Sequence, residues 1–378
     1  MTACYLDHNA TTPLGLPARD AMARAMEAAA RIAGNASSVH GFGRAARKIV
    51  EDARAHVAEL AGVAPANVIF TSGGSEANNA ILRGIGADVR VTSTIEHASV
   101  LDAVDAVRAP VNADGVIDLN ALAEMLNEVQ GRVLISVMAA NNETGVVQPI
   151  AEISALAKNH DAVFHVDAIQ WAGKRPLFEV TAYADAVSLS AHKFGGPQGV
   201  GAILVKDGTA FAPLVRGGGQ ERRRRSGTEN LIGIAGFGAA AEAALTGVHD
   251  FARLAGLRDR IENELGDVAR IYGQGAERLP NTTCIAMPGV SAETQVMAFD
   301  LAGIAVSAGS ACSSGKIEPS YVLLAMGLSN EDAAEAIRVS LGTGTTEQDV
   351  ERFIQTWRDL YERHVKTAKP KGTGEAAA

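Results

Sequence analysis

The sequence predicts an α/β fold in which helices cover both faces of a mostly parallel sheet, with a smaller α+β domain at the C-terminal end. Between about residues 66 and 206, short runs rich in Val and Ile alternate with helix-like segments, a pattern typical of parallel sheets. The runs are apolar at successive positions, which indicates strands buried on both faces. After about residue 250, amphipathic stretches surround two isolated strand-like runs, which indicates a separate, smaller unit.

Each expected element follows from its own stretch of sequence. The strands of the large domain are expected at NVIFTS (67–72), VRVTS (89–93), RVLISVMA (132–139), AVFHVDA (162–168), AVSLS (186–190) and GVGAILV (199–205). Helices are expected between them at 75–86, 120–130 and 150–160. The C-terminal part predicts helices at 251–266, 292–302 and 346–365, and strands at 281–287 and 336–342.

The domain boundary is expected between residues 245 and 250, where this pattern changes. We therefore expect a large domain over 16–248 and a small domain that combines 1–15 with 249–368. Residues 369–378 have linker composition, so a disordered tail is expected there.

Composition and charge exclude several classes of protein. The 378 residues carry a net charge of −9, which gives no electrostatic footprint for nucleic acid. The N-terminus has no secretory pattern, and the longest apolar stretch, 231–245, is shorter than the roughly 20 residues of a membrane span. Three widely spaced cysteines make no disulfide framework. A protein of the reducing cytoplasm, with neither nucleic acid nor membrane as a partner, is expected.

The strongest chemical signal is SLSAHKFGGPQGVG (188–201), which places Ser190, His192 and Lys193 just beyond a buried strand. Ligands of open α/β sheets bind at the carboxyl ends of the strands. Lys193 could still be an ordinary surface lysine. Its setting on a turn with His, Gly and Pro instead favours covalent chemistry on a carbonyl group.

Other strand ends carry further polar groups. Asp167, in FHVDAIQ, could cap a helix or oppose a buried cation such as a pyridinium nitrogen. FTSGGSEANNA (70–80) could be a plain helix cap or a phosphate-binding helix start. His97 and the stretch NNETG (141–145) follow two more strands. Because parallel strands end at one edge of the sheet, all these groups are expected to converge.

Two features remain outside this cluster. The run Arg222–Arg225 is either a solvated basic loop or part of a site, depending on the Ser-Gly-Thr that follows it. Cys312 lies in AGSACSSG, where its small neighbours would not bury it, whereas Cys284 in NTTCIAM is expected to be a buried hydrophobe.

These motifs together resemble the cysteine desulfurases of the NifS/IscS type, in the class-V aminotransferase branch of the fold-type-I PLP enzymes. The resemblance covers nearly the whole chain, and it is specific because the motifs keep their order and spacing. The matching segments are YLDHNATT (5–12), GNASSVHGFGR (34–44), TSGGSEANN (71–79), EHASVLD (96–102), NNETGVVQPI (141–150), HVDAIQ (165–170), SLSAHKFGGPQGVGA (188–202), RRSGTEN (224–230), AGSACSSGKIEPSYVLLAMG (308–327) and AIRVSLG (336–342).

The resemblance implies a PLP-dependent transferase fold of type I with a seven-stranded-type sheet. It implies conversion of L-cysteine to L-alanine, with the sulfur passing to Cys312 as a persulfide and then to an acceptor or scaffold protein for iron–sulfur cluster assembly. No intrinsic metal site is implied, although Cys312 can be a transient iron–sulfur ligand shared with a scaffold. An aminotransferase or a selenocysteine lyase on the same fold stays open as an alternative, as does a non-catalytic assembly partner.

The resemblance also implies roles for single residues. Lys193 resembles the lysine that carries PLP, Asp167 the partner of the pyridinium nitrogen, and Gln170 the group beside the phenolic oxygen. His97 resembles the imidazole stacked on the ring, a candidate acid or base. The implied phosphate ligands are Gly74, Ser75, Ser190 and His192.

Three more roles concern the substrate and the subunit interface. Thr228 resembles a phosphate ligand donated across the interface of a homodimer. Asn142, beside the cofactor, and Arg338 resemble the residues that bind the substrate carboxylate, a task that suits the planar guanidinium. One residue departs from the family pattern: His8 stands where Asn or Tyr is more common, which leaves details of substrate contact open.

Overall fold

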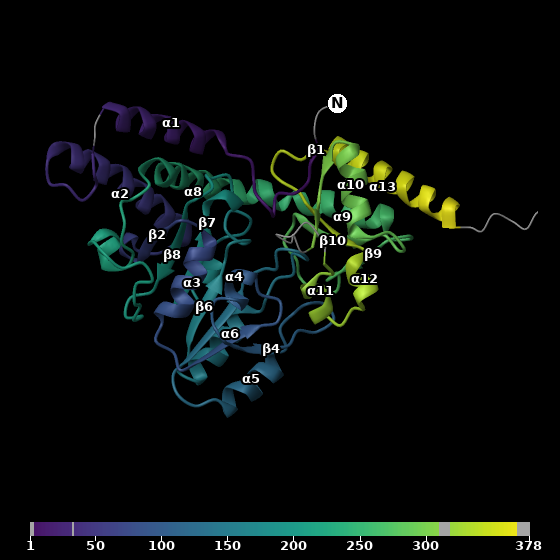
Figure 1. The fold of residues 1–378 in the computed structure, drawn as a ribbon, viewed down its shortest axis with the longest axis horizontal. Helices are drawn as coiled ribbons and strands as arrows, with labels where there is room; N and C mark the ends of the chain where they lie inside the picture. Colours follow the sequence, from purple (N-terminus) through teal and green to yellow (C-terminus); the bar gives the residue numbers. More distant parts are fainter. Residues whose placement is uncertain (1–3, 32–33, 310–317, 369–378) are drawn as a thin grey trace, which may run out of the picture.

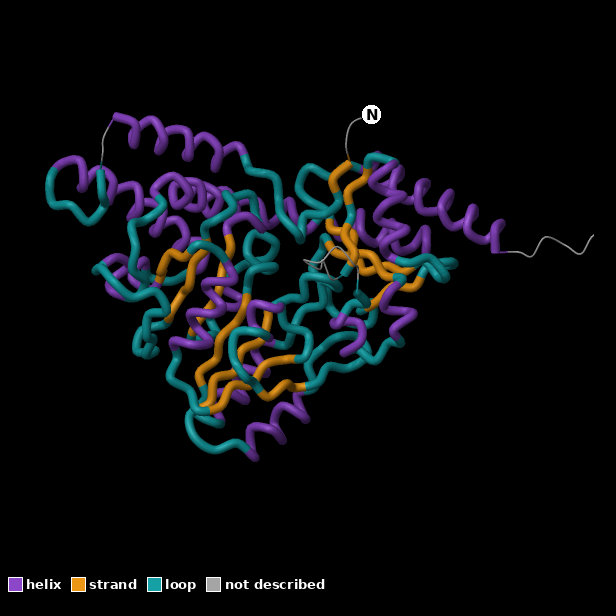
Figure 2. The backbone as a smooth tube through the Cα atoms, viewed as in Figure 1, coloured by secondary structure: helices purple, strands orange, loops and turns teal. Residues whose placement is uncertain are grey.

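The computed structural model describes residues 4–31, 34–309 and 318–368. Cys312 lies outside the described residues. Figure 1 shows a large unit that contains the main sheet and a smaller unit beside it, which carries the C-terminal helix. Figure 2 shows the strands gathered into two separate groups, one in each unit.

The large unit is built on a seven-stranded sheet with the strand order β2-β8-β7-β6-β5-β3-β4. Its strands are β2 (Val68–Thr71), β3 (Val89–Ser93), β4 (Val107–Ala109), β5 (Val133–Met138), β6 (Val163–Asp167), β7 (Ala186–Ser190) and β8 (Gly201–Val205). Neighbouring strands are parallel except that β8 runs antiparallel to both β2 and β7. The predicted fold class is confirmed, and β4 is the one strand of this sheet that the sequence did not predict.

The helices of the large unit are α1 (Leu16–Arg31), α2 (Gly41–Ala61), α3 (Gly74–Gly84), α4 (Ala98–Leu101), α5 (Leu119–Glu128), α6 (Ile150–Asn159), α7 (Phe178–Thr181) and α8 (Leu231–Ala252). Both faces of the sheet are buried, as its apolar runs predicted. In β8, Ala202 and Leu204 join a core with α2, α6 and α8, whereas Ile203 and Val205 join a second core with α3. Successive side chains of a strand point to opposite faces, so one run of sequence serves both cores.

The smaller unit contains a four-stranded antiparallel sheet in the order β12-β13-β10-β9. Its elements are α9 (Leu254–Leu265), β9 (Arg270–Tyr272), β10 (Thr282–Ala286), α10 (Ala292–Leu301), β11 (Ile304–Ala305), β12 (Ser307–Ala308), α11 (Tyr321–Ala325), α12 (Asn330–Ala334), β13 (Ala336–Ser340) and α13 (Glu347–Ala368). The N-terminal β1 (Cys4–Tyr5) pairs in parallel with β11. Phe299 and Phe353 stack at the centre of this unit's core, with ring centroids 4.9 Å apart.

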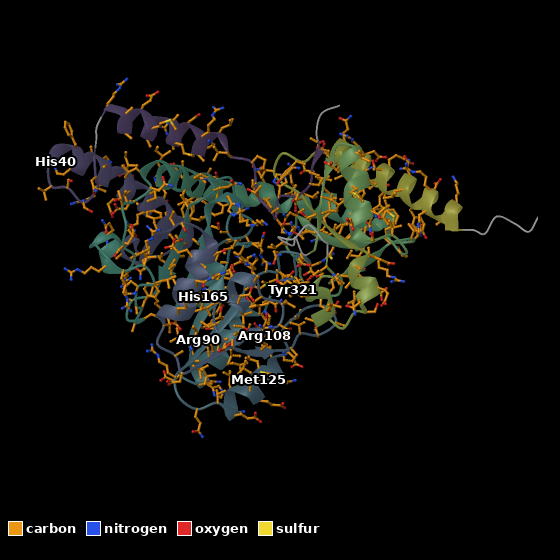
Figure 3. All side chains as sticks on the ribbon, viewed as in Figure 1. His40, Arg90, Arg108, Met125, His165 and Tyr321 are labelled. Carbon is orange, nitrogen blue, oxygen red and sulfur yellow. The ribbon has the colours of Figure 1, made fainter. Side chains whose placement is uncertain are left out.

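The two units meet along a mixed apolar and polar contact. Ile95, which follows β3, packs with Cys284, Val322 and Leu323 of the smaller unit. The Tyr321 hydroxyl donates a hydrogen bond of 2.7 Å to the carbonyl oxygen of Glu96. Figure 3 labels Tyr321 where α11 faces the large unit. This contact holds the smaller unit against the loop that carries His97.

The helical stretch Leu231–Leu265 has a mean hydropathy of 1.6 in its most apolar window, so by length and composition alone it could cross a membrane. However, 44 % of that window is buried, and α8 packs against α1 and α2. The absence of a membrane partner stays a prediction. So does the domain boundary at residue 248, because α8 runs across that position without a break.

Candidate active site

Lys193 lies in a short 3-10 turn, Ala191–Lys193, that follows β7 directly. Its Nζ donates to the main-chain oxygens of Asn9 at 2.8 Å and Ala10 at 2.9 Å. Burial, with Arg338 adding a like charge, lowers the pKa of Lys193 to about 8. The lysine is therefore not an ordinary surface residue: its amine points into the molecule and is shifted toward the neutral, nucleophilic form.

Asp167 ends β6, and its side chain is buried. The Asn78 amide donates to Oδ2 at 2.7 Å, and the Ile169 N–H donates to Oδ1 at 2.9 Å. Residues after Asp167 form turns rather than a helix, so the helix-cap interpretation is wrong. Burial raises the pKa of Asp167, while Asn78 and the positive charge of Lys193 act against this rise. In the part of the chain that the structure describes, Asp167 forms no ion pair, and a buried carboxylate of this kind is suited to a cationic ligand atom.

His97 is joined to Asp167 through two intermediate side chains. The His97 Nδ1 contacts the Ser99 hydroxyl at 2.8 Å and accepts from the Ser99 N–H at 3.1 Å. Asn78 donates to both the Ser99 hydroxyl and Asp167. Because Nδ1 is an acceptor, the neutral ring carries its proton on Nε2. The exposed ring therefore presents an N–H group on its far side.

The start of α3 is an open helix terminus. Gly73, at the N-cap with φ +152°, provides no side-chain cap, although Glu76 Oε2 in the first turn accepts from the Ser72 N–H at 2.7 Å. A Cβ at Gly74 would lie 2.2 Å from Ile169 Cδ1 and 3.4 Å from Ser190 Cβ. The chain thus lies close to the turn after β6 and to the end of β7, and the first amide N–H groups of the helix have no intrahelical acceptor.

The remaining predicted phosphate ligands differ in burial and in hydrogen bonding. Ser190 is buried at the end of β7, and Ser75 is exposed in the first turn of α3. The His192 Nδ1 contacts the Thr11 hydroxyl at 3.1 Å, and burial together with Lys193 lowers the pKa of His192 to about 4. Thr228 is exposed in the loop before α8, and its role across an interface stays a prediction.

The arginine run is partly solvated and partly ion-paired, and its place in a site stays a prediction. Arg222 and Arg223 are exposed, whereas Arg225 forms an ion pair of 2.9 Å with Glu76 in the first turn of α3. Glu221, at a positive φ of 45°, is buried against Arg54 with an N–O distance of 2.7 Å. These pairs fix the loop that leads to Thr228 beside the open helix terminus.

Arg338 and Asn142 lie at the small-unit side of the site. Arg338 is 6 % exposed, and it donates to the Asn142 main-chain oxygen at 3.2 Å and to Asp7 Oδ1 at 2.7 Å. Its Nε and the Asn142 Oδ1 are buried polar atoms without a hydrogen-bond partner among the described residues. Unpaired groups of this kind are costly unless a ligand satisfies them.

Several site residues were missed by the sequence analysis, and Asn9 is the most connected of them. The Asn9 side chain contacts Lys174, Asn281 and Thr282, and its main-chain oxygen accepts from Gln170 and Lys193. Lys174 binds Gln170 Oε1 at 2.7 Å. The one sequence signal for Lys174 is the GK pair at 173–174, and the segment around that pair otherwise reads as a turn.

Glu96 and His8 are also buried beside the site. Glu96 is fully buried, accepts from the Ser93 hydroxyl at 2.5 Å, and has no partner for Oε2 among the described residues. Burial raises the pKa of Glu96 to about 8. His8, the departure from the family pattern, has a buried Nδ1 without a partner in the described chain, and burial with the nearby Lys174 lowers its pKa to about 4.

This arrangement fits PLP. The buried carboxylate of Asp167 suits the ring nitrogen, and the amine of Lys193, whose pKa is lowered, suits the aldehyde. The open start of α3 suits the phosphate. The buried Asn142 Oδ1 has no hydrogen-bond partner among the described residues, as expected of an atom that a ligand would contact. Among the described residues, no group of three or more His, Cys, Asp and Glu side chains could hold a metal ion.

Comparison with known proteins gives a consistent answer. Residues 4–353 match the family model described as aminotransferase class-V. A cysteine desulfurase of Cereibacter sphaeroides is 43 % identical over 393 residues, which covers 99 % of this chain and 100 % of the relative. An IscS-like cysteine desulfurase of Mycobacterium tuberculosis is 40 % identical, and the match covers 93 % of this chain and 94 % of the relative.

Solved structures agree with the sequence relatives. The X-ray structure of a NifS-like protein from Rickettsia africae superposes with a TM-score of 0.88 at 34 % identity, over 96 % of this chain and 100 % of that one. The chain therefore belongs to the class-V aminotransferase family and, within it, to the PLP-dependent cysteine desulfurases.

Proposed function

We propose that the chain takes the sulfur of L-cysteine onto Cys312 as a persulfide, releases L-alanine, and then passes the sulfur to an acceptor protein. The observation that carries this proposal is the convergence of Lys193, Asp167 and Arg338 at one edge of the sheet. Lys193 and Asp167 come from neighbouring strand ends, and Arg338 comes from the smaller unit. A substrate amine and carboxylate could thus be held between the two units.

Substrate binding would use the polar atoms that the site leaves without a partner among the described residues. Arg338 would hold the substrate carboxylate, with its unpaired Nε and the side chain of Asn142 as further contacts. Asp7 already orients the guanidinium, since Ser307 holds the second Asp7 oxygen at 2.8 Å. Asp167 would hold the pyridinium nitrogen of PLP and Gln170 its phenolic oxygen. Gly74, Ser75, Ser190 and His192 would surround the phosphate.

Lys193 and His97 would move the protons. PLP, when bound, supplies the electron sink that makes the Cα proton of the amino acid acidic. Lys193 Nζ, held near neutrality by burial, would take that proton. Nε2, the His97 ring nitrogen that does not contact Ser99, would carry the proton that His97 exchanges with the substrate. The main-chain oxygens of Asn9 and Ala10 both accept from Lys193 Nζ and so hold the amine in a fixed position.

Sulfur transfer would then use the Cys312 thiolate as the nucleophile. A bond forms between the Cys312 sulfur and the substrate sulfur, and the bond between substrate Cβ and sulfur breaks with its electron pair left on carbon. Two protons restore the carbon skeleton as alanine. The sum is cysteine plus thiol giving alanine plus persulfide, so no external oxidant or reductant is needed.

The proposal extends to the assembly and its partners. We infer a cytoplasmic homodimer in which Thr228 serves the partner subunit's phosphate site, and an iron–sulfur scaffold or similar protein as the sulfur acceptor. Support comes from the family names, from the exposed position of Thr228, and from the contact between Arg225 and Glu76 beside α3.

The test is Cys312→Ala, assayed with L-cysteine and with L-selenocysteine in the presence of a thiol reductant. Sulfide release from L-cysteine should fall at least about 100-fold, because the alanine has no nucleophile to accept sulfur. Cys4→Ala is the matched control: Cys4 is buried and its pKa is raised to about 12, mainly by burial, so its loss should leave the rate unchanged.

Other outcomes would contradict the proposal. Full-rate sulfide release by the Cys312 variant would refute the persulfide step. Formation of a keto acid instead of alanine would favour an aminotransferase. A selenocysteine rate well above the cysteine rate in the wild-type protein would favour a selenocysteine lyase.

A further inference from the structure

Lys174 is a buried lysine that the proposed chemistry does not use. It lies in the turn after β6 and is only 3 % exposed. Its Nζ donates to Asn9 Oδ1 at 2.6 Å and to Gln170 Oε1 at 2.7 Å. Among the described residues, no carboxylate lies within ion-pair distance of Lys174, so both of these hydrogen bonds go to amide oxygens.

Burying a lysine without a carboxylate is costly, and here the neighbours add to the cost. Burial lowers the pKa of Lys174 well below its usual range, and the positive charges of Lys193 and Arg338 lower it further. His8 also lies close enough for Lys174 to lower its pKa. A group retained at such a cost needs a compensating role.

The hydrogen-bond chemistry of lysine suggests what that role is. A side-chain amide has a donor end and an acceptor end, and its orientation follows from its partners. Lys174 Nζ donates in both of its hydrogen bonds, so the oxygen end of each amide faces it. Asn9 Nδ2 is then turned toward Thr282 Oγ1 at 2.9 Å and Asn142 O at 3.1 Å.

The same constraint acts on Gln170. Its oxygen is taken by Lys174, so its NH₂ group is the end that remains for other partners. One N–H donates to Asn9 O at 3.0 Å, the same oxygen that accepts from Lys193. Among the described residues, the second N–H has no hydrogen-bond acceptor, so it is available to a ligand. Lys174 thereby sets the direction of a network that ends at the catalytic amine.

We propose that Lys174 is a positioning residue that holds the Gln170 amide with its N–H side toward the cofactor and holds Asn9 with its main-chain oxygen toward Lys193. This inference rests on the proposed function, in which Gln170 lies beside the phenolic oxygen of PLP. A donor at that oxygen stabilises its ionised form, so Lys174 helps to set the pH at which the bound cofactor changes its visible spectrum.

The experiment compares Lys174→Met, Lys174→Gln and Lys174→Arg with the wild-type protein. Three quantities are measured: the melting temperature without PLP, the dissociation constant for PLP, and the pH midpoint of the visible absorption of the loaded protein. Lys174→Met frees Gln170 to turn its oxygen toward the site. We expect PLP to bind about tenfold more weakly and the midpoint to rise by about one pH unit.

The other variants test the direction of the hydrogen bonds. Lys174→Arg keeps a donor for both amide oxygens, so its midpoint should stay near that of the wild type. Lys174→Gln can also accept, so its midpoint should rise, and this variant serves if the methionine variant does not fold. Asp167, Asp7, Arg338, Lys193 and His8 are the charged or titratable groups nearby, and all of them are unchanged in each variant.

Ser154→Ala is the matched control for a purely structural loss. Ser154 is buried in α6 and donates to Tyr183 O at 2.9 Å, away from the site. This control should lower the melting temperature and leave the midpoint unchanged. If Lys174→Met and Lys174→Gln behave like Ser154→Ala, the inference is overturned. If the wild-type protein itself acquires no visible band with PLP, the proposed function fails instead.

Discussion

Lys193 needs a neutral Nζ to bond to a carbonyl carbon, and its surroundings favour that form. Burial is the largest cause of its lowered pKa of about 8, and Arg338 adds to it. Below this pH the amine is protonated and has no free electron pair. As the pH rises through about 8, the neutral fraction grows and then becomes nearly complete.

The rate at which the apoprotein takes up PLP should therefore rise about tenfold per pH unit up to about pH 8 and level off above it. Stopped-flow absorbance over a series of buffers measures this rate. Nα-acetyl-lysine is the matched control, because its amine has an ordinary pKa of about 10.4 and its rate should keep rising. A protein rate that also climbs steadily to pH 10 would contradict the prediction.

Two site residues that the sequence pattern itself indicated, Lys193 and Asp167, lie at the ends of neighbouring strands, so topology alone brings them together. Asn9 and Lys174 are different. Asn9 is hydrogen-bonded to Asn281, 272 positions away, and Lys174 is hydrogen-bonded to Asn9, 165 positions away. Hydrogen bonds across such separations leave no periodicity and no local motif, so only the folded chain reveals them.

At the scale of elements, β8 illustrates how tightly the phosphate side is built. A Cβ at Gly201, the first residue of β8, would lie 2.6 Å from Leu189 O and 2.7 Å from the Gly73 carbonyl carbon. Both contacts are with backbone, which cannot move aside as a side-chain tip could. The strand thus fixes the position of Gly73 and, with it, the open start of α3.

Gly201→Ala should weaken PLP binding at least about tenfold, since it displaces the helix terminus, and it should cost about 1–3 kcal/mol of stability through overpacking. Equilibrium titration with PLP and thermal unfolding measure the two effects. Gly247→Ala in α8 is the control: its Cβ would meet nothing within 4 Å, and alanine favours the helix by up to about 1 kcal/mol. Unchanged PLP affinity in Gly201→Ala would refute the assigned role of this strand.

Most strands of the large unit were predictable because both of their faces are buried and mainly apolar. β5 (Val133–Met138) and β7 (Ala186–Ser190) agree with their predicted runs to within one residue at each end. β4 was missed because it is a three-residue edge strand with Val107 and Arg108 exposed. His165 in β6, labelled in Figure 3, is an exception to the apolar rule: it is paired to the Ser136 and Ser188 hydroxyls of the two neighbouring strands.

At the scale of the whole molecule, the N-terminal segment connects the two units. Asn9 donates to Asn142 of the large unit and to Thr282 of the smaller one, while its N–H donates to Ser340 at 2.9 Å. The His8 N–H donates to Ser340 O, and Thr12 N–H donates to His192 O. The segment therefore passes over Lys193 between the units, and movement of the smaller unit would be transmitted directly to the catalytic amine.

Thr228 is exposed in this chain, and its predicted phosphate contact would be made in the partner subunit. Mixed dimers can test this role. Lys193→Ala removes the amine, and Thr228→Ala removes the predicted phosphate ligand, so each homodimer should have little activity. If Thr228 serves the partner subunit, a dimer with one subunit of each kind contains one site with both residues intact. We expect such a dimer, purified through two different tags, to recover up to about half of the wild-type activity.

The alternative arrangement gives a different result from the same mixture. If Thr228 serves its own subunit, one site lacks Lys193 and the other lacks Thr228, so no intact site forms and activity stays at the level of the homodimers. Sedimentation at micromolar concentration provides the necessary control, because the assay requires a stable dimer. A fully active wild-type monomer would rule out a shared site, since the exposed loop before α8 would then complete the phosphate site within one chain.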